Sequence, residues 1–351
     1  MATGIELPLR QRGRASVDFL SYCALGSATV REAAARAVEE RFPAPEALPA
    51  DLDDRHRLIE EQAVEDQSYR AEQLMGEWHS RHHGLIAEEA FDEVRDEIVP
   101  RLHALDEGPA QLEVNADFQA PAYWDGVAFH RTAHGWDGSA YAGCVHGEIV
   151  HRRMVDRLFP GGIFQQRRRV AAMAPRDSYR RILELGCSTG HFTLALAESY
   201  PDAELHGVDL SLRTLEHARR IANAQGLPWR LYRRPAEATG FPAEHFDLVA
   251  SYILLHELPA EAVRAVFAEA FRVLEPGGDL LMSDVTRYAD LDPLAEWRAD
   301  RGARYGGEPH WRASASLDLD AVAREAGFEQ VEAGGEPPRN YPYVVRARKP
   351  A

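Results

Sequence analysis

The sequence predicts an α/β fold in its C-terminal half, preceded by a helical accessory region. From residue 182 onward, short apolar runs alternate with helical patterns, which is the order of a parallel sheet with crossover helices. A turn with two glycines joins the first run to a helix, and residues 27–105 are dominated by helix formers. We therefore divide the chain into a helical accessory region over 1–117, connecting helices that cap the substrate over 118–175, and an α/β core domain over 176–351.

The composition is that of a globular protein. Of the 351 residues, 45% are hydrophobic and 27% charged, and no apolar run approaches membrane-spanning length. Met1 to Arg14 lacks the apolar centre of a signal peptide and is expected to form a loose tail. Three widely spaced cysteines fit a reducing compartment, so we expect a cytoplasmic protein. The formal net charge of −16 repels a phosphate backbone, which argues against nucleic acid as a partner.

Helical patterns fill the accessory region. A hydroxyl side chain can cap a helix over 30–38, and a longer polar helix is expected over 51–82. Gly84 is expected to break that helix before another begins, over 86–105. Helices of this kind form an accessory bundle, a cap or a dimerisation arm, and a homodimer through them is our expectation.

Residues 118–151 are dense in aromatic and histidine side chains. Such a segment suits a substrate pocket, but a docking surface between the helical region and the core uses the same residue types, so both interpretations stay open. The segment contains Phe118, Tyr123, Trp124, Phe129, Trp136, Tyr141, His130, His134, His146 and His151.

We expect no metal site among these histidines. His130 and His134 stand at positions i and i+4, but Gly135 and polar neighbours disfavour a regular helix there. His146 and His151 are five residues apart and would point about 140° away from each other on an α-helix.

The glycine turn is the feature around which the core domain is organised. Residues 182–185 read as a buried strand, Gly186 and Gly190 allow a tight turn, and a helix can begin at His191. A second strand ends at Asp209, 19 positions after Gly190, a spacing that places an acid beside a ribose. A dinucleotide site needs two further glycines where the sequence has serine and histidine, which disfavours a reductase.

Five ordered blocks resemble the class I S-adenosylmethionine-dependent methyltransferases. The first motif of that family, Glu/Asp-x-Gly-x-Gly-x-Gly, stands here as Glu184, Gly186, Ser188 and Gly190, with serine as the middle residue. The resemblance implies a Rossmann-like doubly wound sheet, S-adenosylmethionine as the cofactor, and methyl transfer as the activity. It continues through residues 207–211, 236–237, 246–251 and 272–278.

The resemblance also implies which residues hold the cofactor. Glu184 would meet its amino group, and the backbone from Gly186 through Cys187 and Ser188 to Gly190 would approach its methionine and ribose parts. Asp209 would bind the ribose hydroxyls, Leu210 would pack on adenine, and Ala236 with Glu237 would recognise the ring, although Pro235 replaces the usual aspartate. Ser251 and Tyr252 would border the methyl group, and Arg167, Arg168 or Arg169 would reach the carboxylate.

Deprotonation of an acceptor hydroxyl or amine requires a group that titrates near neutrality. His256 follows the central strand and is one candidate, while His130 and His134 are the others. His256 can equally cap the next helix, and a carbon or neutral amine acceptor needs no base. The connection over 285–316 is long enough to cover the acceptor.

These observations lead to one functional hypothesis and its alternatives. We expect methylation of an oxygen, nitrogen or carbon atom of a small organic molecule, such as a secondary metabolite, with no membrane partner. The alternatives are an RNA or protein methyltransferase, and a non-catalytic scaffold that binds the cofactor.

Overall fold

A computed structural model describes residues 3–132, 135–159, 161–336 and 340–351, and within them it contains one eight-stranded sheet. The strand order is β1-β4-β3-β2-β5-β6-β8-β7. The strands are β1 (Gln111–Glu113), β2 (Arg181–Leu185), β3 (Glu204–Asp209), β4 (Arg230–Arg233), β5 (Phe246–Tyr252), β6 (Leu274–Asp284), β7 (Glu329–Gly335) and β8 (Tyr343–Arg348).

The sheet is parallel except at one edge. Strand β2 pairs in parallel with β3 on one side and with β5 on the other, so that Leu183 lies beside both His206 and Val249. Strand β8 is antiparallel to both β6 and β7. Because the chain moves outward from β2 in both directions, the strand order reverses between β2 and β5, and ligands bind at such a switch point. The expected Rossmann-like doubly wound sheet is confirmed.

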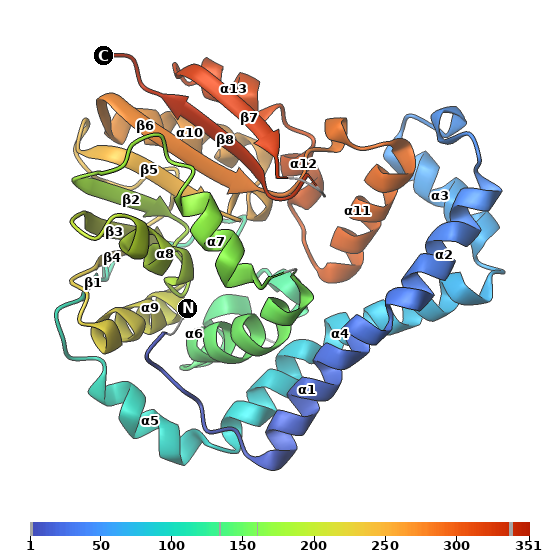
Figure 1. Cartoon of the computed structure of the whole chain (residues 1–351), viewed down its shortest axis with the longest axis horizontal. Helices are drawn as coiled ribbons and strands as arrows, with labels where there is room; N and C mark the ends of the chain where they lie inside the picture. Colours follow the sequence, from blue (N-terminus) through green and yellow to red (C-terminus); the bar gives the residue numbers. More distant parts are fainter. Residues whose placement is uncertain (1–2, 133–134, 160, 337–339) are drawn as a thin grey trace.

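Helices cover both faces of the sheet (Figure 1). Helices α7 (Ile163–Ala171), α8 (His191–Ser199) and α9 (Leu212–Gln225) pack on one face, and α10 (Ala260–Val273) and α13 (Leu319–Glu325) pack on the other. Side chains on successive strand positions point to opposite faces. Ile182 therefore joins the first apolar cluster, whereas Leu183 joins the second.

The N-terminal region is a helical arm that projects from the core (Figure 1). Its long helix α4 runs through Gly84 without a break, contrary to our expectation. The break lies instead before Asp66, whose side chain accepts a hydrogen bond from the Tyr69 N–H and so begins a new helix. The arm contains α1 (Gln11–Gly26), α2 (Ala28–Arg41), α3 (Leu52–Ala63), α4 (Gln67–Asp92) and α5 (Arg95–Ala104).

The connection over 285–316 is largely helical and joins the arm to the core. It contains α11 (Pro293–Gly306) and α12 (Trp311–Ala315). Trp297 of α11 is 2% exposed and stacks on Tyr69 of α4, with 6.4 Å between the ring centroids. The arm and this connection therefore share one apolar cluster, formed by Val38, Ile59, Ala63, Tyr69, Leu294 and Trp297.

The N-terminal segment is not a loose tail over the residues that the structure describes. Ile5, Leu7 and Leu9 are buried against the core. The Thr3 hydroxyl donates to the buried carboxylate of Glu148, 3.1 Å away. This segment lies across the connecting helices, which are α6 (Ala142–Cys144), a π-helix over Val145–Val155, and α7.

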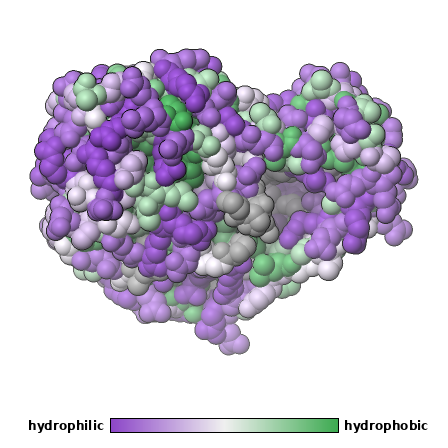
Figure 2. Space-filling model, turned by 45° about the horizontal axis from the view of Figure 1, so that its top comes forward, coloured by the Kyte–Doolittle hydropathy of each residue, from purple (hydrophilic) through white to green (hydrophobic). Residues whose placement is uncertain are grey.

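The arm and the core form two lobes with a hollow between them (Figure 2). Among the described residues, no helix combines the length and apolar character that crossing a bilayer requires.

Candidate functional site

A cavity of about 490 Å³ lies at the carboxyl ends of the central strands. Gly186 follows β2, Asp209 ends β3, and Tyr252 ends β5, and all three line it. The opposite wall comes from α4 of the arm, from the aromatic segment and from residues near α12. The cavity therefore has two ends, which we call the cofactor end, beside Gly186 and Asp209, and the acceptor end, beside His256 and Trp311.

The glycine turn at the cofactor end depends on backbone conformations that side chains disfavour. Gly186 has φ of 69°, and a β-carbon there would lie 2.7 Å from the Leu254 side chain. Ser188, at the position where the family motif has glycine, has φ of 46°. Such strain is typical of functional sites, and it lets the turn approach a ligand closely.

Asp209 is held by backbone donors on both sides. Its Oδ2 accepts from the Ser188 N–H and its Oδ1 from the Ser211 N–H, each at 2.9 Å. Burial raises the pKa of Asp209 to about 6 despite these hydrogen bonds. At neutral pH the carboxylate is therefore ionised and presents acceptor capacity to the cavity, as a ribose requires.

Leu210, Ala236 and Glu237 line the same end of the cavity. The Tyr123 hydroxyl donates to Glu237 Oε1 at 2.6 Å, while Glu237 Oε2 is buried and has no hydrogen-bond partner among the residues that the structure describes. An exocyclic amine would satisfy this oxygen. Glu237, two residues after Pro235, thus offers a carboxylate oxygen near the position where the family usually has aspartate.

Four residues expected to touch the cofactor lie behind the cavity wall. Glu184 points toward α8, where its carboxylate accepts from the Thr193 hydroxyl. Cys187 packs closely on Gly207, and Gly190, at φ of 79°, begins α8 beneath the Trp229 ring. Ser251 is fully buried in β5. These residues shape the turn and the strand ends from behind.

Arg167 is a buried cation in the cavity wall. It is 4% exposed, and its Nη2 donates to His151 Nδ1 at 3.0 Å. Its Nε and Nη1 have no hydrogen-bond partner in the described part of the chain, and its guanidinium lies 5.2 Å from the centre of the Tyr252 ring. A buried guanidinium with free donors calls for an anion such as a carboxylate. Arg168 and Arg169, by contrast, form surface ion pairs with Glu198 and Glu336.

His146 and His151 point the same way, although we expected them to diverge. Their ring centroids are only 4.2 Å apart, and both rings line the cavity. The reason is the π-helix over Val145–Val155, in which hydrogen bonds join residues five apart and bring positions i and i+5 to one face. Burial lowers the pKa of both imidazoles well below the usual value, so they are neutral.

Two candidate bases, His256 and His130, meet at the acceptor end. Burial lowers the pKa of both imidazoles, but their carboxylate neighbours have the larger effect. Asp284 and Glu257 raise the pKa of His256 well above its usual value. Glu308 and Glu257 raise the pKa of His130 to about 10. Both are imidazolium ions at neutral pH and cannot serve as free bases. His134 lies outside the described residues.

Several acceptor-end residues were missed in the sequence. His79 and His83 of α4 line the cavity, and their i, i+4 spacing on a helix was a usable signal. Glu308 and Trp311 reach it from the connection after β6, where no local pattern marks them. The aromatic segment also lines this cavity, through Tyr123, Trp124, Phe129 and Trp136, which favours the pocket interpretation.

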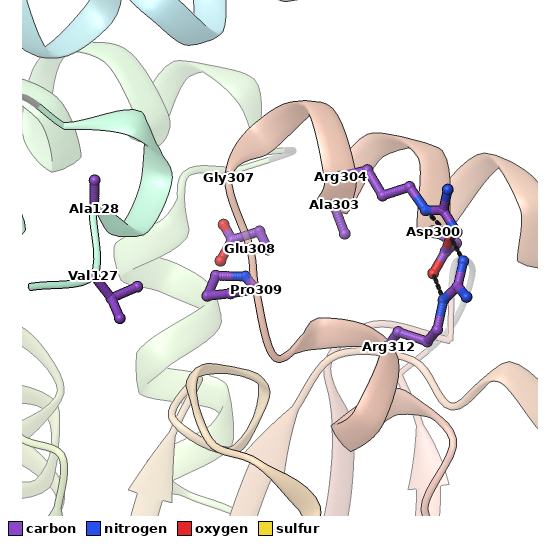
Figure 3. Close-up of a pocket in the computed structure, with 9 residues that line it drawn as sticks. All are labelled: Val127, Ala128, Asp300, Ala303, Arg304, Gly307, Glu308, Pro309 and Arg312. Carbon is purple, nitrogen blue, oxygen red and sulfur yellow. Dashed lines mark hydrogen bonds and ion pairs between the residues drawn. The ribbon is translucent and has the colours of Figure 1, made fainter. Parts of the chain in front are cut away.

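A second cavity, of about 430 Å³, adjoins the first at Glu308 (Figure 3). Glu308 and Pro309 project toward Val127 and Ala128 on one side of it. On the other side, Arg304 and Arg312 both bind Asp300.

Comparisons with known proteins agree with this geometry. Residues 182–278 match the family model of the methyltransferase domain. A demethylmenaquinone methyltransferase of Thermus thermophilus is 37% identical over 37% of this chain and 58% of its own length. A malonyl-[acyl-carrier protein] O-methyltransferase of Methylococcus capsulatus is 28% identical over 64% of this chain and 74% of its own length.

Other relatives are matched over less of their length. A ubiquinone/menaquinone C-methyltransferase of Desulfotalea psychrophila is 32% identical over 34% of this chain, which spans 47% of that relative. Among solved structures, phosphoethanolamine N-methyltransferase 2 of Haemonchus contortus in complex with S-adenosyl-L-methionine has 16% identity and a TM-score of 0.49, over 66% of this chain and 61% of that one. Residues 182–278 are therefore a methyltransferase domain, and this part of the chain is similar to class I S-adenosylmethionine-dependent methyltransferases.

Proposed function

We propose that the protein transfers a methyl group from S-adenosylmethionine to an oxygen, nitrogen or carbon atom of a small organic molecule, such as a secondary metabolite. The observation that carries this proposal is the single cavity of about 490 Å³ that runs from the glycine turn to the acceptor end. A volume of this order suits a small-molecule ligand site.

The residues at the cofactor end suit the parts of S-adenosylmethionine. Asp209 would accept from the ribose hydroxyls, Arg167 would bind the methionine carboxylate, and Glu237 would accept from the adenine amino group. When bound, the cofactor supplies a methyl group on a sulfonium, which is open to direct attack. The main contribution of this chain is to hold the acceptor in line, an alignment that supplies on the order of 7–11 kcal/mol.

The acceptor end distinguishes the proposed enzyme from its alternatives. A non-catalytic scaffold tolerates a blocked acceptor side, whereas here that side is open and lined by polar groups such as His256 and Glu308. The net charge of −16 continues to argue against RNA. In this proposal the ring N–H groups of His130 and His256 donate to carboxylates and hold them in the wall of the acceptor end.

We also propose a homodimer in which the arm forms the interface. Phe19 and Tyr22 of α1 are 61% and 63% exposed, and Leu74 of α4 is 68% exposed. Phe19 contacts Trp78 of α4 edge to face, so these side chains form one apolar surface. Light scattering of the wild type and of Phe19→Glu tests this proposal, which predicts a dimer and a monomer, respectively.

A cytoplasmic location stays part of the proposal. All three cysteines are free thiols, as a reducing compartment favours.

Calorimetric titration tests the central proposal. S-Adenosylmethionine and S-adenosylhomocysteine should bind the wild type with one site per chain, and NADH should not bind. Asp209→Ala should weaken the binding of both adenosyl compounds. Failure of folded protein to bind either compound would overturn the proposal.

A further inference from the structure

The acceptor end contains an unbroken row of alternating carboxylates and imidazoles. Asp284 Oδ1 lies 2.9 Å from His256 Nδ1, and His256 Nε2 lies 3.4 Å from Glu257 Oε1. The same Glu257 oxygen lies 2.9 Å from His130 Nε2, and His130 Nδ1 pairs with Glu308 Oε1. These five residues come from four separate parts of the chain. We call them the acidic row.

The acidic row carries more negative than positive charge. It holds three carboxylates and two imidazoles, so even with both imidazoles protonated one negative charge remains in excess, three minus two. The neighbouring arginines do not neutralise it. Arg312 and Arg304 bind Asp300 and Asp53 instead (Figure 3). Arg167 lies beside Tyr252 and His151, toward the cofactor end.

Two carboxylate oxygens of the row are free. Glu257 Oε2 and Glu308 Oε2 are buried, and neither has a hydrogen-bond partner among the described residues. The Glu308 side chain is only 9% exposed. A buried carboxylate oxygen without a donor is costly, and both glutamates line the cavity. A donor that enters with the acceptor would satisfy them.

Aromatic rings stand beside the two imidazoles of the acidic row. The Trp136 ring lies edge-on to His130, with centroids 5.1 Å apart, and the Trp311 ring lies edge-on to His256 at 5.0 Å. Carboxylates bordered by aromatic rings form a site that attracts an organic cation, because charge pairing and cation–π attraction act together.

From this arrangement we infer that the methyl acceptor is an amine, which binds as an organic ammonium ion to the free oxygens of Glu257 and Glu308. This inference rests on the proposed function and narrows the acceptor to one chemical class. The nitrogen becomes a nucleophile when one of its N–H bonds breaks and the proton forms an O–H bond with a carboxylate. The electron pair of the broken bond then stays on nitrogen and is available to the methyl group.

A divalent metal is the rival occupant. One ligand atom each from His130, Glu257 and Glu308 lies within 4.8 Å of the others. Both ring nitrogens of His130, however, already pair with carboxylates, and a metal would have to displace one of these pairs. An ammonium ion uses the two free oxygens and leaves both pairs in place, so the observations favour the amine.

The test uses the full chain saturated with S-adenosylhomocysteine. Phenethylamine, tryptamine and putrescine are titrated calorimetrically beside the alcohols 2-phenylethanol, tryptophol and 1,4-butanediol. At least one amine should bind tenfold or more tightly than its matched alcohol. Glu308→Gln and Glu257→Gln should each reduce that amine's affinity about tenfold, whereas Glu325→Gln, a surface change, should not alter it. Unchanged S-adenosylhomocysteine affinity shows that each variant is folded.

The possible results separate the inference from the proposed function. Absent S-adenosylhomocysteine binding counts against the function itself. Normal S-adenosylhomocysteine binding with no preference for any amine, or a preference that both glutamine variants retain, overturns the amine inference alone. Titration with Mn²⁺ and Zn²⁺ completes the test: one tightly bound ion per chain, lost in Glu308→Gln, together with no amine binding, would identify a metal centre instead.

Discussion

The two ends of the cavity are built in different ways. The cofactor end is made by short segments at the tips of β2 and β3, where Gly186, Ser188 and Asp209 lie within one strand–helix–strand unit. The acceptor end is assembled from α4, the aromatic segment, the turn after β5 and the connection after β6. The first depends on local backbone conformation. The second depends on how distant parts of the chain pack together.

This difference predicts that the two ends can be damaged separately. Changes within the arm should disturb the acceptor end and leave cofactor binding nearly intact. Changes at the tips of β2 and β3 should abolish cofactor binding without unfolding the arm. The following variants test that separation.

The largest effect, a loss of stability, is expected from Trp297→Ala, because this substitution removes the ring through which α11 packs on the arm. Loss of a buried aromatic side chain costs about 3–5 kcal/mol. Hydrogen exchange in α3 and α11 should rise strongly, while S-adenosylhomocysteine affinity changes less than threefold. Trp297→Phe keeps a ring beside Tyr69 and should lose less than half as much stability. Equal loss of cofactor affinity would show that the two ends are not separable.

Asp209→Ala should have the next largest effect, and here cofactor binding is lost while the arm stays intact. It removes the carboxylate that accepts from the Ser188 and Ser211 N–H groups and that, in our proposal, binds the ribose. The expected loss is about 3 kcal/mol, or a hundredfold in S-adenosylmethionine affinity. Calorimetry measures this, and hydrogen exchange in the arm should stay at its wild-type level. Exchange that rises throughout the arm would contradict the separation.

Arg167→Met should weaken the binding of S-adenosylmethionine by about 2 kcal/mol, because the charged hydrogen-bond donor that we propose for the cofactor's carboxylate is lost. The comparison ligand is 5′-methylthioadenosine, which lacks the amino acid part and should bind wild type and variant alike. Arg169→Met, on the surface beside Glu336, serves as the control. Equal weakening of both ligands would place Arg167 away from the carboxylate.

The smallest effect is a pH dependence of cofactor affinity. Burial raises the pKa of Asp209 to about 6, so its neutral form becomes populated as the pH falls through that value. Because the ionised carboxylate is the better acceptor for hydroxyls, affinity should be constant above pH 7 and about tenfold weaker at pH 5, or about 1.4 kcal/mol. Asp209→Asn should show a flat profile between pH 5 and 8, and a slope retained in this variant would assign the effect elsewhere.

Individual helices show which features could be predicted from the sequence and which could not. The helix after β3 is capped by Ser211, whose side chain accepts from the Thr214 N–H, and by Gly226, and both are residue types that mark helix ends in a sequence. In the arm, by contrast, the expected break at Gly84 was wrong and α1 was missed, because apolar residues follow the helical period only weakly in α1 and α4. The divergence expected for His146 and His151 was also wrong, since a π-helix has a different period from an α-helix.

By itself, the sequence determined the α/β core, the glycine turn and the place of Asp209, because each depends on residues close together in the chain. Only the tertiary structure decided which side chains face the acceptor. His130, Glu257 and Glu308 are distant in sequence, and they pair because the aromatic segment, the turn after β5 and the connection after β6 meet in the folded chain. Local patterns specify backbone conformation, whereas contacts between distant segments are set by the packing of complete elements.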